Sequence, residues 1–218
     1  MSYITNPPRR RFPWYVRVIL ALQRRRYGWE LEPTRLWART PRAFLAMALM
    51  YGALDRARSP IEPRLRSLVQ VRVSQINWCL FCVDLNGATG LKRGVAPEQL
   101  AALERFEDSP VFSEREKAAL AYAETVTRTD RRTDAALFGR LRRHFDDEAI
   151  VELTALVAYQ NLSSQFNAAL GVAPQGFCSA PAAPRASPAQ PPAAGPSRDG
   201  TGEAPPPTRG ARMHDGPA

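Results

Sequence analysis

The chain has 218 residues and a formal net charge of +9, a length that suffices for one well-buried domain with appendages. Three cysteines are too few for a disulfide scaffold, so they fit a reducing cytosol and a single dithiol centre. No run approaches the about eighteen apolar residues of a membrane span, so we expect no transmembrane segment. Residues 1–60 hold twelve arginines and three acidic residues, whereas residues 61–178 are nearly neutral, so the basicity belongs to the N-terminal part.

Residues 1–39 are expected to form a basic helical extension. Pro13 is placed to open a helix that carries Trp14, Val18 and Leu22 on one side and arginines elsewhere. A basic amphipathic helix is compatible with an anionic membrane surface or with nucleic acid. We favour a helix that docks on the domain and keeps its arginines in water, and we expect no nucleic-acid partner. Three consecutive arginines follow the apolar run where a signal peptide would have its cleavage site, so we expect a cytoplasmic protein.

Residues 40–178 predict an all-α domain, because no stretch alternates with period two over a useful length. Thr40 and Pro41 are typical of the start of a helix, which we expect to run to about Leu54. Its apolar stripe consists of Phe44, Leu45, Ala48, Leu49 and Tyr51. The next helices are expected from Glu62 or Pro63 to Ile76, from near Trp78 to near Gly94, and from Pro97 to Phe106.

The second half of the domain carries clear helix starts. Ser113 and Glu116 form a capping box, Thr133 is expected to cap the following helix, and Asp146 is expected to cap the longest one, which covers residues 150–170. That last helix is apolar in its first half, which predicts burial in the monomer or against another subunit. Its second half carries a polar cluster from Gln160 to Asn167. The cluster either faces water or lines a polar pocket.

Residues 179–218 hold ten of the chain's twenty prolines and almost no large apolar residue. Such a composition does not bury enough surface to offset the entropy of ordering. We therefore expect a disordered tail without a catalytic role.

Cys79 and Cys82 form the most specific motif, a cysteine pair with two residues between them. If a helix begins near Trp78, the two thiols lie about one turn apart on one face, and Asn86 follows one turn after Cys82. Thiols in a first helical turn are close to unpaired N–H groups and to the positive end of the helix dipole. Both effects favour the thiolate. We therefore expect the two cysteines to have a lower pKa than a free cysteine, whose pKa is about 8.5. This is the geometry of a redox-active dithiol.

Two simpler interpretations compete with a redox pair. The pair can be half of a zinc site, but Cys178, His144 and His214 do not have the spacing of a second ligand pair, so we expect no metal. The two thiols can also be small apolar side chains in a helix-packing core. The spacing of the two cysteines alone does not prove that they take part in redox catalysis.

The segment around the cysteines resembles the carboxymuconolactone decarboxylase and alkylhydroperoxidase D-like family. The similarity covers about residues 40–178, and its most specific part is a helix followed by Asn77, the cysteine pair and Val83-Asp84. Gly94 through Leu100, Phe145 through Leu153 and Asn161 through Val172 carry the rest of it. The resemblance implies an all-helical fold, a site within the helix pair, and assembly into trimers or hexamers. The decarboxylase members lack the cysteine pair, so their activity fits this chain less well.

In the family's peroxidases, a glutamate and a histidine pass protons to the thiol. Ser67 and Asn86 stand at these positions here, and neither is a general base near neutral pH. The family order makes Cys82 the thiol that attacks the peroxide and Cys79 the resolving thiol, whereas the helix dipole favours Cys79 as the more acidic one. Asn86 is placed to donate a hydrogen bond to a Cys82 thiolate or to polarise a peroxide oxygen. The catalytic candidates are therefore Cys79, Cys82 and Asn86.

Three functions follow from these observations. The first is a dithiol peroxidase or thiol-disulfide oxidoreductase in peroxide defence, with a hydroperoxide or disulfide substrate, an external thiol reductant and no cofactor. The second is a non-catalytic homo-oligomeric scaffold or redox sensor with the same fold. The third is a basic peripheral module whose N-terminal segment binds an anionic surface.

Overall fold

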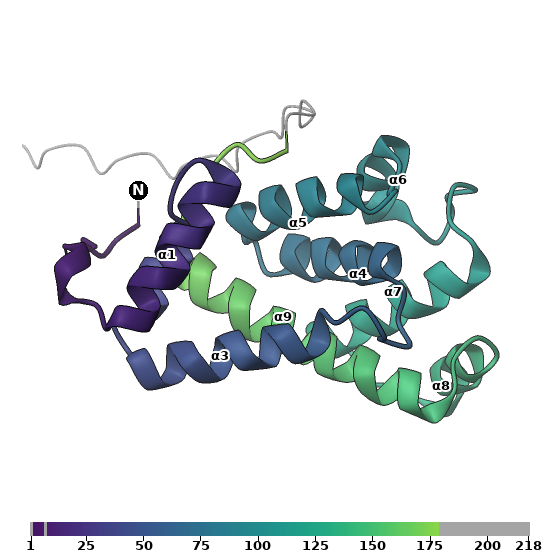
Figure 1. The fold of residues 1–218 in the computed structure, drawn as a ribbon. Coiled ribbons are helices and arrows are strands. Elements are labelled where there is room, and N and C mark those ends of the chain that lie inside the picture. The colour runs from purple at the N-terminus through teal and green to yellow at the C-terminus, as the bar shows by residue number, and fades with distance from the viewer. Residues whose placement is uncertain (1, 7, 179–218) are drawn as a thin grey trace, which may run out of the picture. The chain divides into compact units, whose positions relative to one another are not determined.

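The computed structural model describes residues 2–6 and 8–178, which belong to one compact unit. All the elements in these residues are helical, so the predicted all-α fold is confirmed (Figure 1). In chain order they are η1 (Arg9–Arg11), α1 (Trp14–Tyr27), α2 (Glu32–Trp37), α3 (Pro41–Leu54), α4 (Pro63–Ile76), α5 (Leu80–Lys92), α6 (Pro97–Ala102), η2 (Leu103–Arg105), α7 (Glu114–Thr127), α8 (Ala135–Arg142) and α9 (Asp147–Ala169). The expected disordered tail lies outside the described residues.

Helix α4 is the centre of the fold, and α5, α7 and α9 pack around it (Figure 1). Every residue of α4 from Leu65 to Ser74 is buried. Fully buried side chains such as Leu68 and Val69 each stabilise the fold by about 1.5–3 kcal/mol. A polar side chain in such a helix needs a partner, and Arg72 has one in Glu124 of α7, with 3.0 Å between Nε and Oε2.

The N-terminal helices pack against the rest of the unit through a second apolar cluster. Phe12, Val16, Leu20, Trp37, Ala38 and Phe44 form this cluster. The predicted stripe of α1 is therefore wrong, since Trp14, Val18 and Leu22 are 75%, 49% and 60% exposed. Residues 18–22 are all apolar, so α1 has two possible docking faces, and the aromatic partners on α2 and α3 select the Val16 face.

The predicted stripe of α3 is only partly buried. Phe44 is 5% exposed, but Leu45 and Leu49 are 45% and 66% exposed. Residues 43–50 are all apolar, so their periodicity does not single out one face. Phe44 packs with residues of α1 and α2, whereas Leu45 and Leu49 stay exposed.

The local start and stop signals mostly agree with the structure. The capping box at Ser113 and Glu116 is present, and Asp146 Oδ1 accepts from Ala149 N at 2.8 Å. The cap of α8 is not Thr133 but Asp134, whose Oδ1 accepts from Leu137 N at 2.8 Å. The carboxylate of Asp134 offers two strong acceptor atoms, and it caps the helix in place of the neighbouring hydroxyl of Thr133. Among the described residues, no helix combines the length and the apolarity that crossing a membrane requires.

Candidate active site

A tight turn between α4 and α5 sets the position of the cysteines. Helix α5 begins at Leu80 instead of near Trp78, with Cys79 as its N-cap. Trp78 adopts a left-handed backbone conformation with φ of 55°, which costs a bulky residue about 1–3 kcal/mol. The turn is held by Asn77, whose Nδ2 donates to Asn161 Oδ1 at 2.6 Å and to Ser164 Oγ at 2.8 Å on α9.

Cys79 and Cys82 are joined in a disulfide, with their Cα atoms 5.2 Å apart. Both are buried, at 1% and 4% exposure. The backbone N–H of Cys82 donates to Cys79 Sγ at 3.2 Å, so the sulfur of Cys79 caps the helix. Cys178 is a free thiol.

Asn167 of α9 is a site residue that the sequence did not single out. Its Nδ2 donates to Cys82 Sγ at 3.3 Å, and its side chain is 2% exposed. Its Oδ1 is buried and has no hydrogen-bond partner among the described residues. The polar cluster from Gln160 to Asn167 was the signal, and Asn167 lines a pocket instead of facing water.

A cleft of about 380 Å³ opens beside the disulfide. Its walls come from α5 and α9, from the N-terminal helices α1, α2 and α3, and from Gln70 of α4, and most of its lining is apolar. Cys82, Asn86 and Asn167 line the cleft, whereas Cys79 is not among the described residues that line it. The N-terminal extension thus forms part of the wall at the sulfur.

Asn86 is one turn after Cys82 and takes part in a buried hydrogen-bond network. Its Nδ2 donates to Ser74 Oγ at 3.4 Å, and Gln160 Nε2 donates to the same oxygen at 3.0 Å. Ser74 Oγ in turn donates to the carbonyl of Gln70 at 2.6 Å. This network fixes the amides beside the cysteines but contains no group that titrates near neutral pH.

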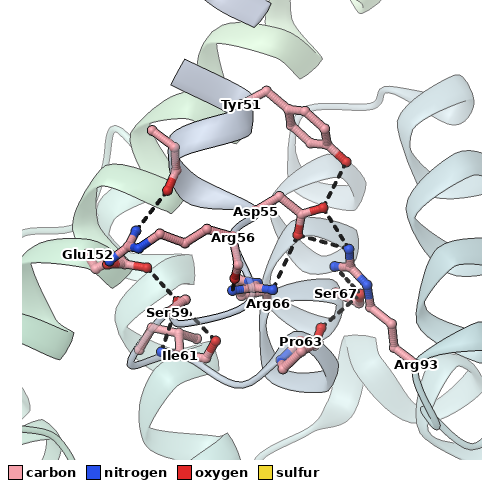
Figure 2. Close-up of polar contacts among 11 residues, drawn as sticks. Tyr51, Asp55, Arg56, Ser59, Ile61, Pro63, Arg66, Ser67, Arg93 and Glu152 are labelled. Carbon is pink, nitrogen blue, oxygen red and sulfur yellow. Dashed lines mark hydrogen bonds and ion pairs between the residues drawn. The ribbon is translucent and has the colours of Figure 1, made fainter. Parts of the chain in front are cut away.

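Ser67 lies apart from the cysteines and does not line the cleft. Figure 2 shows its surroundings, where Arg93 Nη1 donates to Ser67 Oγ at 3.4 Å and Arg93 Nη2 donates to both oxygens of Asp55 at 2.8 and 2.7 Å. Tyr51 also donates to Asp55, at 3.2 Å. Burial of the hydroxyl and the neighbouring Asp55 charge raise the pKa of Tyr51 to about 12. The position at which the family's peroxidases carry a relay glutamate is thus a serine that is bound by Arg93 and donates to the carbonyl of Pro63 at 3.2 Å.

Asp84, the nearest carboxylate in sequence to the cysteines, has a structural role. Its Oδ2 accepts from the backbone N–H of Gln175 and of Phe177 at 2.9 and 3.0 Å, and its Oδ1 accepts from Cys178 N at 2.7 Å. These three bonds fasten the segment after α9 to α5. Asp84 is therefore occupied and is not a base for the dithiol.

Comparisons with known proteins give a consistent result. Residues 41–125 match the sequence model of the Carboxymuconolactone decarboxylase family. The Escherichia coli (strain K12) protein named "Uncharacterized protein YnjA" is 42% identical over 175 residues, which cover 80% of this chain and 96% of that protein.

Solved structures share the fold. One is the "alkylhydroperoxidase AhpD core", an uncharacterized peroxidase-related protein from Ralstonia eutropha JMP134, with 24% identity and a TM-score of 0.73 over 81% of this chain and 94% of that one. Another is the debrominase Bmp8, with 20% identity and a TM-score of 0.70 over the same shares of the two chains. At these identities the likeness establishes the fold alone.

Proposed function

Because the chain belongs to the carboxymuconolactone decarboxylase family, we propose that it is a dithiol peroxidase of the alkylhydroperoxidase D-like kind. Cys82 is the attacking thiol and Cys79 the resolving thiol. The observation that carries this assignment is the position of Cys82 in the wall of the cleft, with Cys79 behind it. The disulfide between them is the oxidised state of the cycle.

The reaction begins with the reduced pair. The Cys82 thiolate attacks the outer oxygen of a hydroperoxide, the O–O bond breaks, and the inner oxygen takes a proton from water and leaves as an alcohol. The sulfenic acid on Cys82 then reacts with the Cys79 thiol, which forms the disulfide and releases water. An external thiol reductant restores both thiols by thiol–disulfide exchange.

Two amides assist the first step. Asn167 Nδ2, 3.3 Å from Cys82 Sγ, stabilises the thiolate because a hydrogen bond to the charged form favours that form. Asn86 lines the cleft one turn after Cys82 and polarises the peroxide. Neither amide transfers a proton, and a positioned acid or base typically contributes about 10²–10⁴-fold. We therefore expect a slow peroxidase whose rate rises with thiolate formation.

The test is peroxide-driven disulfide formation in the reduced, purified protein, followed by stopped-flow kinetics and peptide mass spectrometry. We expect a Cys79–Cys82 link, a trapped sulfenic acid in Cys79→Ser, and no reaction in Cys82→Ser. Cys178→Ser is the matched control and should react like the parent. Mainly Cys82–Cys178 or intermolecular links would refute the assignment.

We also propose that the protein is a homo-oligomer. Support comes from Leu45 and Leu49 on α3 and from Val151 on α9, which are 45%, 66% and 69% exposed. Such apolar surface is typical of an interface between subunits. Light scattering at micromolar concentration should give a multiple of the chain mass, and a strictly monomeric mass would contradict the proposal.

A further inference from the structure

The cleft is elongated along α5, with Cys82 at one end. Helix α5 contributes Phe81, Cys82, Leu85, Asn86 and Thr89 to the lining. Thr89 lies seven positions after Cys82, which corresponds to about 10 Å of helix rise. The cleft therefore extends well beyond the sulfur.

Helix α9 runs antiparallel to α5 along the cleft. Asn167 contacts Cys82, whereas Gln160, seven residues earlier, shares Ser74 with Asn86. Tyr159 precedes Gln160 and also lines the cleft. It therefore lies toward the end that is remote from the sulfur.

The neighbours of Tyr159 confirm this placement. Its ring lies 6.0 Å from that of Tyr51, centroid to centroid. Tyr51 donates to Asp55, and Asp55 is bound by Arg93, which directly follows the last residue of α5 (Figure 2). We call this region, made of Tyr51 and Tyr159, the tyrosine end of the cleft.

Each end of the cleft carries a polar group that lacks a hydrogen-bond partner among the described residues. At the sulfur end this is Asn167 Oδ1. At the tyrosine end it is the hydroxyl of Tyr159, a residue that is 6% exposed as a whole and lines the cleft, and this hydroxyl has no hydrogen-bond partner among the described residues. The hydroxyl of Tyr51 already donates to Asp55. The polar groups of largely buried side chains are normally hydrogen-bonded, so two such groups that face one cleft without a partner point to a bound ligand.

The chemistry of the two groups differs. Asn167 Oδ1 is an acceptor and suits the O–H of a hydroperoxide. Burial, and then the neighbouring Tyr51, raise the pKa of Tyr159, so its hydroxyl stays neutral and donates to an acceptor. The walls between the two groups are largely apolar and include Phe44, Met47 and Leu85. Near the tyrosine end, Arg66 and Arg93 together outweigh the charge of Asp55.

We propose that the substrate is an elongated organic hydroperoxide that carries a carbonyl or carboxylate oxygen at the end remote from the peroxide, and that Tyr159 binds this oxygen. Tyr159 is then the residue that determines specificity. The inference rests on the proposed peroxidase function, and the reaction at Cys82 is the one given above. The apolar body of the substrate occupies the middle of the cleft.

The test compares hydroperoxides in oxidation of the reduced, full-length protein. The probes are octyl hydroperoxide, octanoic acid with a terminal hydroperoxide, its methyl ester, and tert-butyl hydroperoxide as a small reference. We expect the acid or the ester to react about tenfold faster than octyl hydroperoxide, since one good hydrogen bond corresponds to roughly this factor. If the arginines contribute to binding, only the acid should react faster than octyl hydroperoxide. If a carbonyl oxygen suffices, the acid and the ester should both react faster.

Tyr159→Phe removes only the hydroxyl, and it should bring the ratio of acid or ester to octyl hydroperoxide close to one. Tyr122→Phe is the matched control, because Tyr122 lies in the core and its hydroxyl bonds to Thr154. This control should keep the parent's ratio. A ratio unaffected by Tyr159→Phe overturns the inference.

The parent alone keeps the inference falsifiable if Tyr159→Phe does not fold. Equal rates of the parent with the acid, the ester and octyl hydroperoxide overturn the inference, while oxidation by tert-butyl hydroperoxide leaves the proposed function standing. A parent that no hydroperoxide oxidises overturns both.

Discussion

Asn167 donates a hydrogen bond from Nδ2 to Cys82 Sγ at 3.3 Å and so links α9 to the cysteine pair of α5. In the reduced protein we expect the same donor to stabilise the Cys82 thiolate. The two residues are 85 positions apart in the chain, and their contact joins the longest helix to the chemistry.

Asn167→Ala is expected to make the Cys82 thiolate harder to form. A hydrogen bond to a charged group contributes about 1.5–3 kcal/mol, so the midpoint of the pH dependence of Cys82 alkylation should rise by about one to two pH units. Iodoacetamide labelling across pH 5 to 10, read by mass spectrometry, measures it. Ser163→Ala is the control, because Ser163 lines the same cleft but does not donate to the sulfur. An unchanged midpoint in Asn167→Ala would show that the bond does not act on the thiolate.

Asn86→His is expected to restore part of the missing proton relay. The new imidazole would line the cleft one turn after Cys82, and the rate of oxidation by hydroperoxide should rise at least about tenfold. This is the low side of the usual range, because the neighbouring residues are not adapted to a histidine. Ser67→Glu should add little, since Ser67 does not line the cleft and Arg93 Nη1 lies 3.4 Å from its Oγ. Stopped-flow rates of both variants decide this, and a larger gain from Ser67→Glu would contradict it.

Trp37→Ala is expected to destabilise the protein by about 3–5 kcal/mol, the usual cost of removing a buried tryptophan side chain. Trp37 is 8% exposed and stacks on Phe166 of α9 with 3.8 Å between ring centroids. Urea denaturation gives the free energy of unfolding. Trp14→Ala is the matched control, because Trp14 is 75% exposed and its loss should cost no more than about 0.5 kcal/mol. Equal effects of the two changes would mean that the extension is not packed on α9.

Glu124 is expected to make the stability depend on acid pH. Burial acts to raise its pKa, but the hydrogen bonds and charges of Arg72 and Arg128 outweigh burial and lower the pKa below its ordinary value. A lowered pKa means that the stabilisation is complete above the unfolded-state pKa of about 4.3 and is lost as the pH falls through the folded-state pKa. Glu124→Gln should therefore cost about 3–5 kcal/mol at pH 7 and less at pH 3.

Urea denaturation at pH 7 and pH 3 measures both values. Glu114→Gln is the control on the same helix, because Glu114 is 68% exposed and its ion pairs lie at the surface. It should cost no more than about 1 kcal/mol at either pH. A cost of Glu124→Gln that does not shrink in acid would refute the role of the charge.

The sequence by itself determined the helical class and most helix ends, because these depend on neighbouring residues. Ser113 and Glu116 form their capping box within four residues, and Gly94, with φ of 85°, ends α5 by a conformation that glycine adopts easily. The geometry of the cysteine pair also depends only on neighbouring residues, since one helical turn brings Cys79 and Cys82 together.

Only the tertiary structure decided which faces are buried and what stands beside the sulfur. The apolar runs of α1 and α3 offer more than one docking face, and the choice of Val16 and Phe44 depends on partners elsewhere in the chain. Asn167 and Tyr159 reach the cleft because α9 packs antiparallel to α5, and no local pattern encodes that packing. Periodicity shows which residues lie on one face of a helix, whereas a site built from six helices depends on long-range contacts that each helix alone does not specify.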